Sequence, residues 1–286
     1  MTSQIALVSE TPHVSLAELT IVANALQKQV TRDFSLLWTV TATVGAFQTV
    51  EDAPVGSWHV VIRDDIVSDA AGIHQLDASH QPFALVRWAA QWSLTASHEI
   101  LEMLADPFGN RLMPGDSPKP DQGRVLFLVE VCDPCQSAAV AYTVNGVLVS
   151  DFCTPDYFAP SGTSGARYSF SGAVTEPRQV LPDGYLTWLY PATGHLWQLL
   201  MEDGNRRLTD VGPQPPANAC LRVTSDRATA KLRSAAYARA PRSGLISRSE
   251  CGPGLREEAI SKTTSASSTR IAATLRQQIQ RTNRSG

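Results

Sequence analysis

The stretch Thr95-Ala-Ser-His-Glu-Ile-Leu-Glu-Met-Leu-Ala-Asp-Pro107 decides how the rest of the chain is interpreted. Its apolar residues recur at helical spacing and Pro107 cannot continue a helix, so the stretch predicts the second half of a helix. His98 and Glu102 are four positions apart, which places them on one helix face with their Cβ atoms about 5–6 Å apart. An imidazole nitrogen and a carboxylate oxygen at this spacing can bind one divalent ion at roughly 2.0–2.2 Å.

Glu99 follows His98 directly and occupies the position of the general base in His-Glu-x-x-His metallohydrolases. Glu102 stands where those enzymes have a second histidine, which keeps a ligand and adds a negative charge. A histidine and two glutamates on a helix are also typical of a solvated polar face. The apolar residues around the motif favour burial instead, and buried charges must be paired or bound to a metal ion.

A catalytic metal site has three protein ligands as a rule, so a third ligand is expected elsewhere in the chain. The best candidate is Glu130, because it follows the apolar run 125–129, where a buried carboxylate otherwise has no explanation. Asp133 and Asp106 are the alternatives. A residue before proline at a helix end, such as Asp106, more often closes a turn or supports a ligand.

Several other polar residues have plainer interpretations. Cys132-x-x-Cys135 lacks the second half of a zinc knuckle, and Pro134 favours a tight turn whose thiols pack near the site. Tyr157 is a candidate oxyanion donor, although an ordinary partly buried tyrosine is the simpler interpretation. His74 and His80 fall in the segment 68–81, which is interpreted as a loop.

Two separated blocks carry a resemblance to a known family. Ser97-His98-Glu99-x-x-Glu102-x-x-x-Asp106-Pro107, followed by Glu130-x-x-Asp133-x-Cys135, is similar to the signature of zincin-like metallopeptidases, versions of which occur in phosphate-induced, exordium-like proteins. The resemblance covers roughly residues 70–160. It implies an α+β, zincin-like fold, in which a twisted mixed sheet and a backing helix support the active-site helix. It also implies a Zn²⁺ site built on His98 and Glu102.

The remaining elements follow from local patterns. Ser15 and Glu18 form a capping box for a helix over residues 16–32, and the runs 36–44, 58–62 and 82–86 predict strands. Residues 108–123 predict an irregular crossing, and Asn145-Gly146 predicts a hairpin turn. Short strands are also predicted at 168–170, 185–190 and 195–200.

Composition and charge divide the chain in two. Of its 286 residues, 1–212 are predicted to form the zincin-like domain, and 213–286 a basic, Ser- and Arg-rich, disordered tail. From Asp226 onward there are 12 Lys and Arg but only 4 Asp and Glu. These arginines are not interleaved with aromatic residues, so the tail favours a solvated linker over a nucleic-acid-binding arm.

The N-terminus has no signal-peptide pattern, no run of about 18 apolar residues occurs, and the five cysteines are unevenly spaced. These features predict a cytoplasmic protein without a membrane span. The leading hypothesis is a zinc-dependent hydrolase acting on a peptide or protein, with His98, Glu102 and Glu130 as ligands and Glu99 as the base. The alternative is an inactive, metal-stabilised binding module. A di-iron site would need a second Glu-x-x-His helix.

Overall fold

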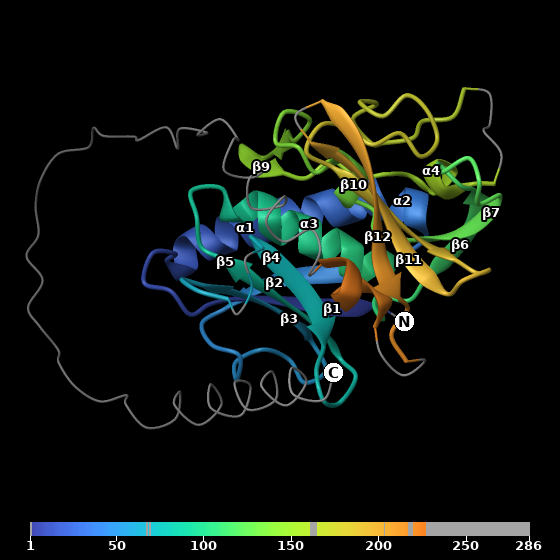
Figure 1. The fold of residues 1–286 in the computed structure, drawn as a ribbon. Helices are drawn as coiled ribbons and strands as arrows, with labels where there is room; N and C mark the ends of the chain where they lie inside the picture. The colour runs from blue at the N-terminus through green and yellow to red at the C-terminus, as the bar shows by residue number, and fades with distance from the viewer. Residues whose placement is uncertain are drawn as a thin grey trace, which may run out of the picture. The chain divides into compact units, whose positions relative to one another are not determined.

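The helix predicted around the His-Glu-x-x-Glu motif is α3, Trp92–Ala105, and it runs through the interior of the protein (Figure 1). Every residue of α3 except Ser93 is buried, which confirms the prediction that the motif lies in the core. The helix ends at Asp106, immediately before Pro107, whose ring excludes a further turn. The computed structural model describes residues 2–66, 68, 70–160, 165–202, 204–216 and 220–226, all within the unit Met1–Ser243.

A five-stranded mixed sheet lies beneath α3. Its order is β2 (Ala42–Phe47), β1 (Ser3–Ser9), β3 (Trp58–Arg63), β5 (Pro82–Arg87) and β4 (Gly72–Leu76). The first four are mutually parallel, whereas β4 pairs antiparallel with β5 and ends the sheet. The predicted strands 58–62 and 82–86 are confirmed. The segment 68–81 was predicted to be a loop, and this was wrong, because β4 occupies its middle.

The N-terminal helical segment is longer and less regular than the helix predicted over residues 16–32. α1 (Leu16–Lys28) begins at Ser15, whose hydroxyl accepts a hydrogen bond from the Glu18 amide at 3.2 Å. The chain then continues as a π-helix, η1 (Gln29–Phe34), and a final turn, α2 (Ser35–Trp38). The strand predicted over 36–44 is therefore wrong for residues 36–38. Residues 36–38 belong to α2 instead. Thr39 caps this helix with a left-handed φ of 56°.

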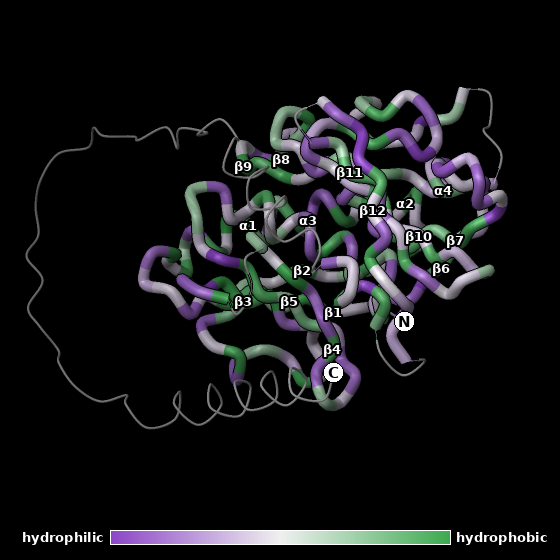
Figure 2. Tube along the Cα trace, viewed as in Figure 1, coloured by the Kyte–Doolittle hydropathy of each residue, from purple (hydrophilic) through white to green (hydrophobic). Residues whose placement is uncertain are grey.

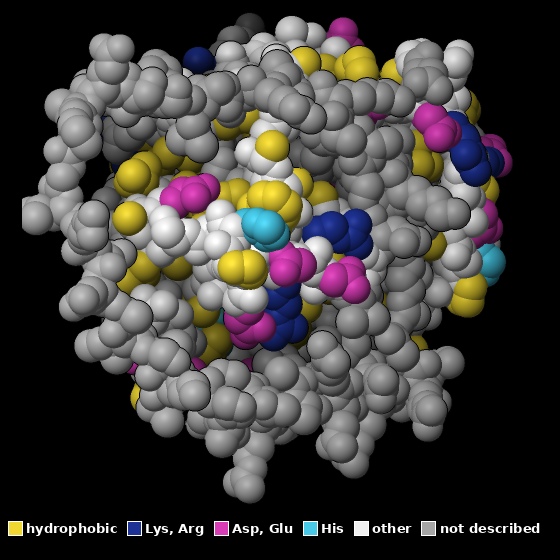
Figure 3. All heavy atoms as spheres, turned by 90° about the vertical axis from the view of Figure 1, so that its left-hand side faces the viewer, with side chains coloured by type: hydrophobic (Ala, Val, Ile, Leu, Met, Phe, Trp, Pro, Cys, Tyr) yellow, Lys and Arg dark blue, Asp and Glu magenta, His cyan; other side chains and the backbone are white. Residues whose placement is uncertain are grey.

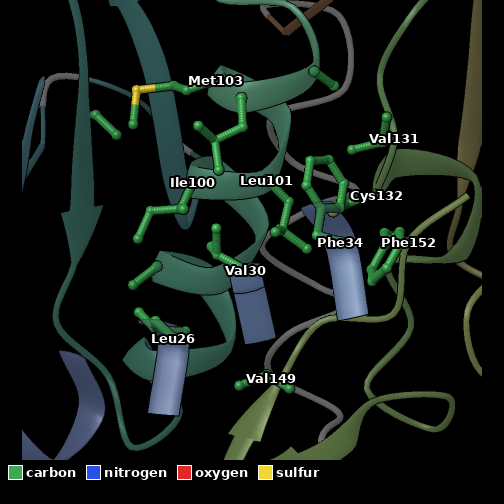
Figure 4. Packing of buried hydrophobic residues seen from close by; sticks show 14 of the residues in the cluster. Leu26, Val30, Phe34, Ile100, Leu101, Met103, Val131, Cys132, Val149 and Phe152 are labelled. Carbon is green, nitrogen blue, oxygen red and sulfur yellow. The ribbon is translucent and has the colours of Figure 1, made fainter. Parts of the chain in front are cut away.

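Both α1 and α3 lie on the same side of the sheet and share one hydrophobic core with it. Leu26, Val30 and Phe34 share this core with Ile100, Leu101 and Met103 of α3 (Figure 4). The core continues into the chain that follows the first sheet, through Val131, Cys132 and Phe152 (Figure 4). The motif helix is thus fixed from both sides by apolar contacts.

The rest of the described chain is rich in strands. A second, antiparallel sheet has the order β12 (Asn205–Pro213), β11 (His195–Glu202), β10 (Tyr185–Tyr190), β7 (Arg124–Leu128) and β6 (Leu112–Asp116). A hairpin joins β8 (Tyr142–Val144) to β9 (Val147–Val149), and Asn145 and Gly146 turn it with φ values of 51° and 80°. Two short helices, η2 (Asp133–Cys135) and α4 (Pro155–Phe158), lie between these strands, and residues 221–226 are also helical.

The hairpin and the predicted strands at 185–190 and 195–200 are confirmed. Residues 168–170 contribute only an isolated bridge between Ser169 and Cys153. The irregular crossing predicted over 108–123 was wrong in part, because β6 lies within it. The coarse prediction of an α+β fold is confirmed, while a zincin-like fold stays a prediction. The tail prediction from residue 227 onward lies outside the described residues.

Hydropathy follows this arrangement. Figure 2 shows hydrophobic residues along β3 and β5, and hydrophilic residues in the loops. On the described part of the face in Figure 3, acidic and basic side chains lie next to one another and form no continuous basic stripe. Among the described residues, no helix is both long enough and apolar enough to cross a membrane.

Candidate metal centre

The two predicted ligands on α3 lie together. His98 Nε2 is 3.2 Å from Glu102 Oε2, and both side chains are fully buried. The spacing of four residues brings them onto one helix face, as the sequence predicts. Burial makes this pair different from an ordinary surface pair, because neither side chain can be compensated by water.

The chain after β7 brings further carboxylates to this face of α3. Asp133 Oδ1 lies 3.2 Å from His98 Nε2, and Asp133 is completely buried. The amide of Cys132 donates a hydrogen bond to Glu102 Oε1 at 3.2 Å and so fixes the loop against the helix. Glu130 belongs to the same cluster, because oxygens of Glu102, Glu130 and Asp133 all lie within 4.8 Å of one another.

The three candidate third ligands, Glu130, Asp133 and Asp106, have different partners. Asp133, one of the two alternatives to Glu130, lies 3.2 Å from His98, whereas Glu130 contacts Arg222 at 2.5 Å. Asp106 closes the turn after α3, where its Oδ2 accepts the Arg111 amide at 2.7 Å. This is the turn role that the residue before a proline was expected to have.

Glu99 points to the sheet edge. Its Oε2 lies 2.9 Å from Nδ1 of His74, which projects from β4. Gly72, two residues earlier on the same face of β4, allows this approach, because a Cβ there would lie 2.6 Å from Glu99 Oε1. His74 was interpreted as a loop histidine, and this was wrong. The strand is only five residues long, so its alternation is too short to stand out in the sequence.

Arg222 is a member of the cluster that sequence reasoning missed. Residues 220–226 lie against the chain after α3, and the Arg222 side chain is fully buried. Its Nη1 is 2.8 Å from Glu102 Oε2, 2.5 Å from Glu130 Oε2 and 3.0 Å from His74 Nδ1. The sequence analysis placed this segment in the tail because no apolar period continues beyond residue 213.

The cluster has more acidic than basic groups. Four carboxylates, those of Glu99, Glu102, Glu130 and Asp133, are at most 2% exposed, and Arg222 forms ion pairs with two of them. Burial raises the pKa of Glu130 well above its usual value; Arg222 opposes this rise, while Glu102 and Asp133 add to it. Buried acidic groups that crowd one another in this way favour the binding of a cation.

Two of these carboxylates have unused oxygens. Glu130 Oε1 and Asp133 Oδ2 are buried without a hydrogen-bond partner in the part of the chain that the structure describes. Buried polar atoms are normally satisfied, so free lone pairs beside an imidazole suggest a missing ligand. The pKa of the His74 imidazole is lowered by burial and by the Arg222 charge, although Glu99 opposes this shift.

The thiols and Tyr157 follow their plainer interpretations. Residues 133–135 form a tight 3₁₀ turn, and Cys135 Sγ lies 3.9 Å from Cys153 Sγ without a disulfide. The Tyr157 hydroxyl donates to the carbonyl of Gln179 at 3.1 Å, which gives it a structural role. Cys132 is the exception, because its Sγ, His98 and Glu102 together could also hold a metal ion.

The distances from His98 to the two acids each suit a small divalent ion. In a tetrahedral site with bonds of roughly 2.0 Å, neighbouring donor atoms are about 3.3 Å apart. His98 Nε2 is 3.2 Å from an oxygen of Glu102 and 3.2 Å from an oxygen of Asp133.

Compared with models of protein families, with curated proteins and with solved structures, the chain matches none of them.

Proposed function

We propose that this protein is a zinc-dependent hydrolase whose ion is held by His98, Glu102 and Asp133. One observation carries the proposal: His98 Nε2 lies 3.2 Å from carboxylate oxygens of both acids, in a site closed to water. Glu130 completes the acidic surroundings and is available as a fourth donor.

Glu99 is the proposed general base. A bound zinc ion would supply Lewis acidity and a water whose pKa is near 7. Glu99 would accept a proton from the attacking water and return it to the leaving amine. His74 supports this assignment, because its contact with Glu99 Oε2 holds the carboxylate in one orientation.

A peptide is the proposed substrate class. The support comes from β4, which lies at the end of the strand order and carries His74 into the site. An extended peptide can add to the edge of a sheet through main-chain hydrogen bonds. The prediction of a zincin-like fold rests on the same arrangement, a mixed sheet supporting a buried motif helix. The prediction of a reducing, cytoplasmic location accords with the free thiols of the described cysteines.

The second candidate function is a metal-stabilised binding module. It is favoured by the burial of the site, because His98, Glu99 and Glu102 are all 0% exposed. In such a protein the ion would stabilise the fold and no peptide would reach Glu99.

Metal analysis of purified protein tests the site. After incubation with zinc and removal of free metal, wild type and the His80→Ala control should each retain one zinc per chain. His98→Ala and Asp133→Asn should retain far less. Equal zinc in wild type and His98→Ala would refute the site.

Glu99→Gln separates the two candidate functions. A hydrolase should lose peptide cleavage in this variant while keeping its zinc. A binding module should show no cleavage in the wild type, and the variant should then keep both its zinc and its stability.

A further inference from the structure

Arg222 lies where a cation is expected. Its Nη1 contacts Glu102 Oε2 at 2.8 Å and Glu130 Oε2 at 2.5 Å, so one nitrogen compensates two buried carboxylates. Glu102 is also a proposed zinc ligand. The Arg222 guanidinium and a divalent ion would therefore both pair with the Glu102 carboxylate.

The guanidinium is incompletely accommodated. Its Nε and Nη2 are buried without a hydrogen-bond partner among the residues that the structure describes. Nη1 also lies 3.0 Å from His74 Nδ1, which already contacts Glu99. An arginine in a permanent structural role normally uses more of its five donors, as in bidentate pairs with carboxylates.

The segment that carries Arg222 is attached by polar contacts and by Leu221, which packs with Leu128, Leu189 and Leu196. The Arg222 amide donates to the carbonyl of Gly109 at 3.2 Å, and the Leu221 amide donates to Asn110 Oδ1 at 2.9 Å. Gly109 is closely covered, because a Cβ added there would overlap Cys220 Sγ and lie 3.0 Å from Arg222 Cβ. Beyond these, Ser225 is hydrogen-bonded to Thr187 and Gln198 in the second sheet.

We propose that residues 220–226 form an internal plug, in which the Arg222 guanidinium competes with a divalent ion for Glu102 and Glu130. When the segment withdraws, the carboxylates become available to the ion and the site gains an opening to solvent. The inference rests on the proposed metal site, and it explains how a buried site could become accessible.

Zinc affinity of the full-length chain tests the plug, measured by competition with a chromogenic chelator. Arg222→Gln should bind zinc at least about tenfold more tightly than wild type, because the competing charge is removed. Arg207→Gln is the control, since Arg207 pairs with Glu202 on the surface. Its affinity should equal that of wild type.

A second variant displaces the segment without altering Arg222. Gly109→Ala should push Cys220 and Arg222 away and also tighten zinc binding. Its matched control is Gly123→Ala, because Gly109 and Gly123 have φ values of 63° and 62°, but a Cβ at Gly123 meets nothing within 4 Å. Circular dichroism confirms that each variant is folded. If Arg222→Gln does not fold, Gly109→Ala against Gly123→Ala decides.

The outcomes are distinguishable. Equal zinc affinity in wild type and both test variants would overturn the plug and leave the metal site intact. Weaker binding in Arg222→Gln would also overturn it, because Arg222 would then support the ligands. Failure of every variant and of the wild type to bind zinc would overturn the metal site and the plug together.

Discussion

Replacing Gly72 with alanine should destabilise the protein, because β4 passes unusually close to α3. A Cβ at this position would lie 2.5 Å from Thr95 Cγ2 and 2.6 Å from Glu99 Oε1. Ordinary contacts between non-bonded carbon atoms are about 3.5–4.0 Å, so the overlap is roughly 1 Å. The neighbours cannot easily move, because Thr95 and Glu99 are buried in a packed helix.

The size of the effect follows from two opposing contributions. Overpacking a core costs about 1–3 kcal/mol. Replacing a flexible glycine within a strand returns roughly 0.5–1 kcal/mol. The midpoints of these ranges give a fall of about 1 kcal/mol in the free energy of unfolding, which corresponds to a loss of roughly 2–4 °C in Tm for a domain of this size.

Urea unfolding followed by tryptophan fluorescence measures this change as a lower midpoint with an unchanged slope. Thr95→Ser removes the nearest methyl group and provides the control. The double variant should be more stable than the sum of the single effects predicts, by about 0.5 kcal/mol or more. A Gly72→Ala protein as stable as wild type, or strict additivity with Thr95→Ser, would refute the close approach.

Two further predictions concern buried polar groups and thiols. The Ser97 hydroxyl donates to Gln29 Oε1 at 2.8 Å and accepts from the Ser150 amide at 3.0 Å, so Ser97→Ala should cost about 1–3 kcal/mol in urea unfolding, and a loss below about 0.5 kcal/mol would contradict this. Cys153 is 0% exposed and burial raises the pKa of its thiol, so it should resist iodoacetamide in the native protein and react only after unfolding. Cys220 is only half-buried and provides the comparison within the same chain. Mass spectrometry locates the label. Rapid labelling of Cys153 in the native protein would show that its packing is wrong.

The sequence predicted α3 and its motif because signals at several levels agreed. Helical spacing, the proline stop and the apolar surroundings of His98 all indicate a buried helix, and the buried run before Glu130 indicates a strand that ends in acids. Asn145-Gly146 predicted its hairpin for a similar reason, since the turn requires two positive φ values and these residues tolerate them.

The rest was missed for physical reasons. Leu36 and Leu37 have a strand-like composition, but a π-helix carries α1 onward and places them in a helical turn. His74 lies on a strand too short for its alternation to be recognised. Arg222 is fixed by Glu130, Glu102 and His74, which are distant in sequence, and no local pattern encodes such contacts.

The long separation between Arg222 and its partners has a consequence for biosynthesis. Residue 222 leaves the ribosome after β4, α3 and the acids that follow β7, with 148 positions between it and His74. Domains fold as units, and Arg222 belongs to the same unit, Met1–Ser243, as these acids. Glu102 and Glu130 therefore lack their buried arginine partner until residues 220–226 have been synthesised.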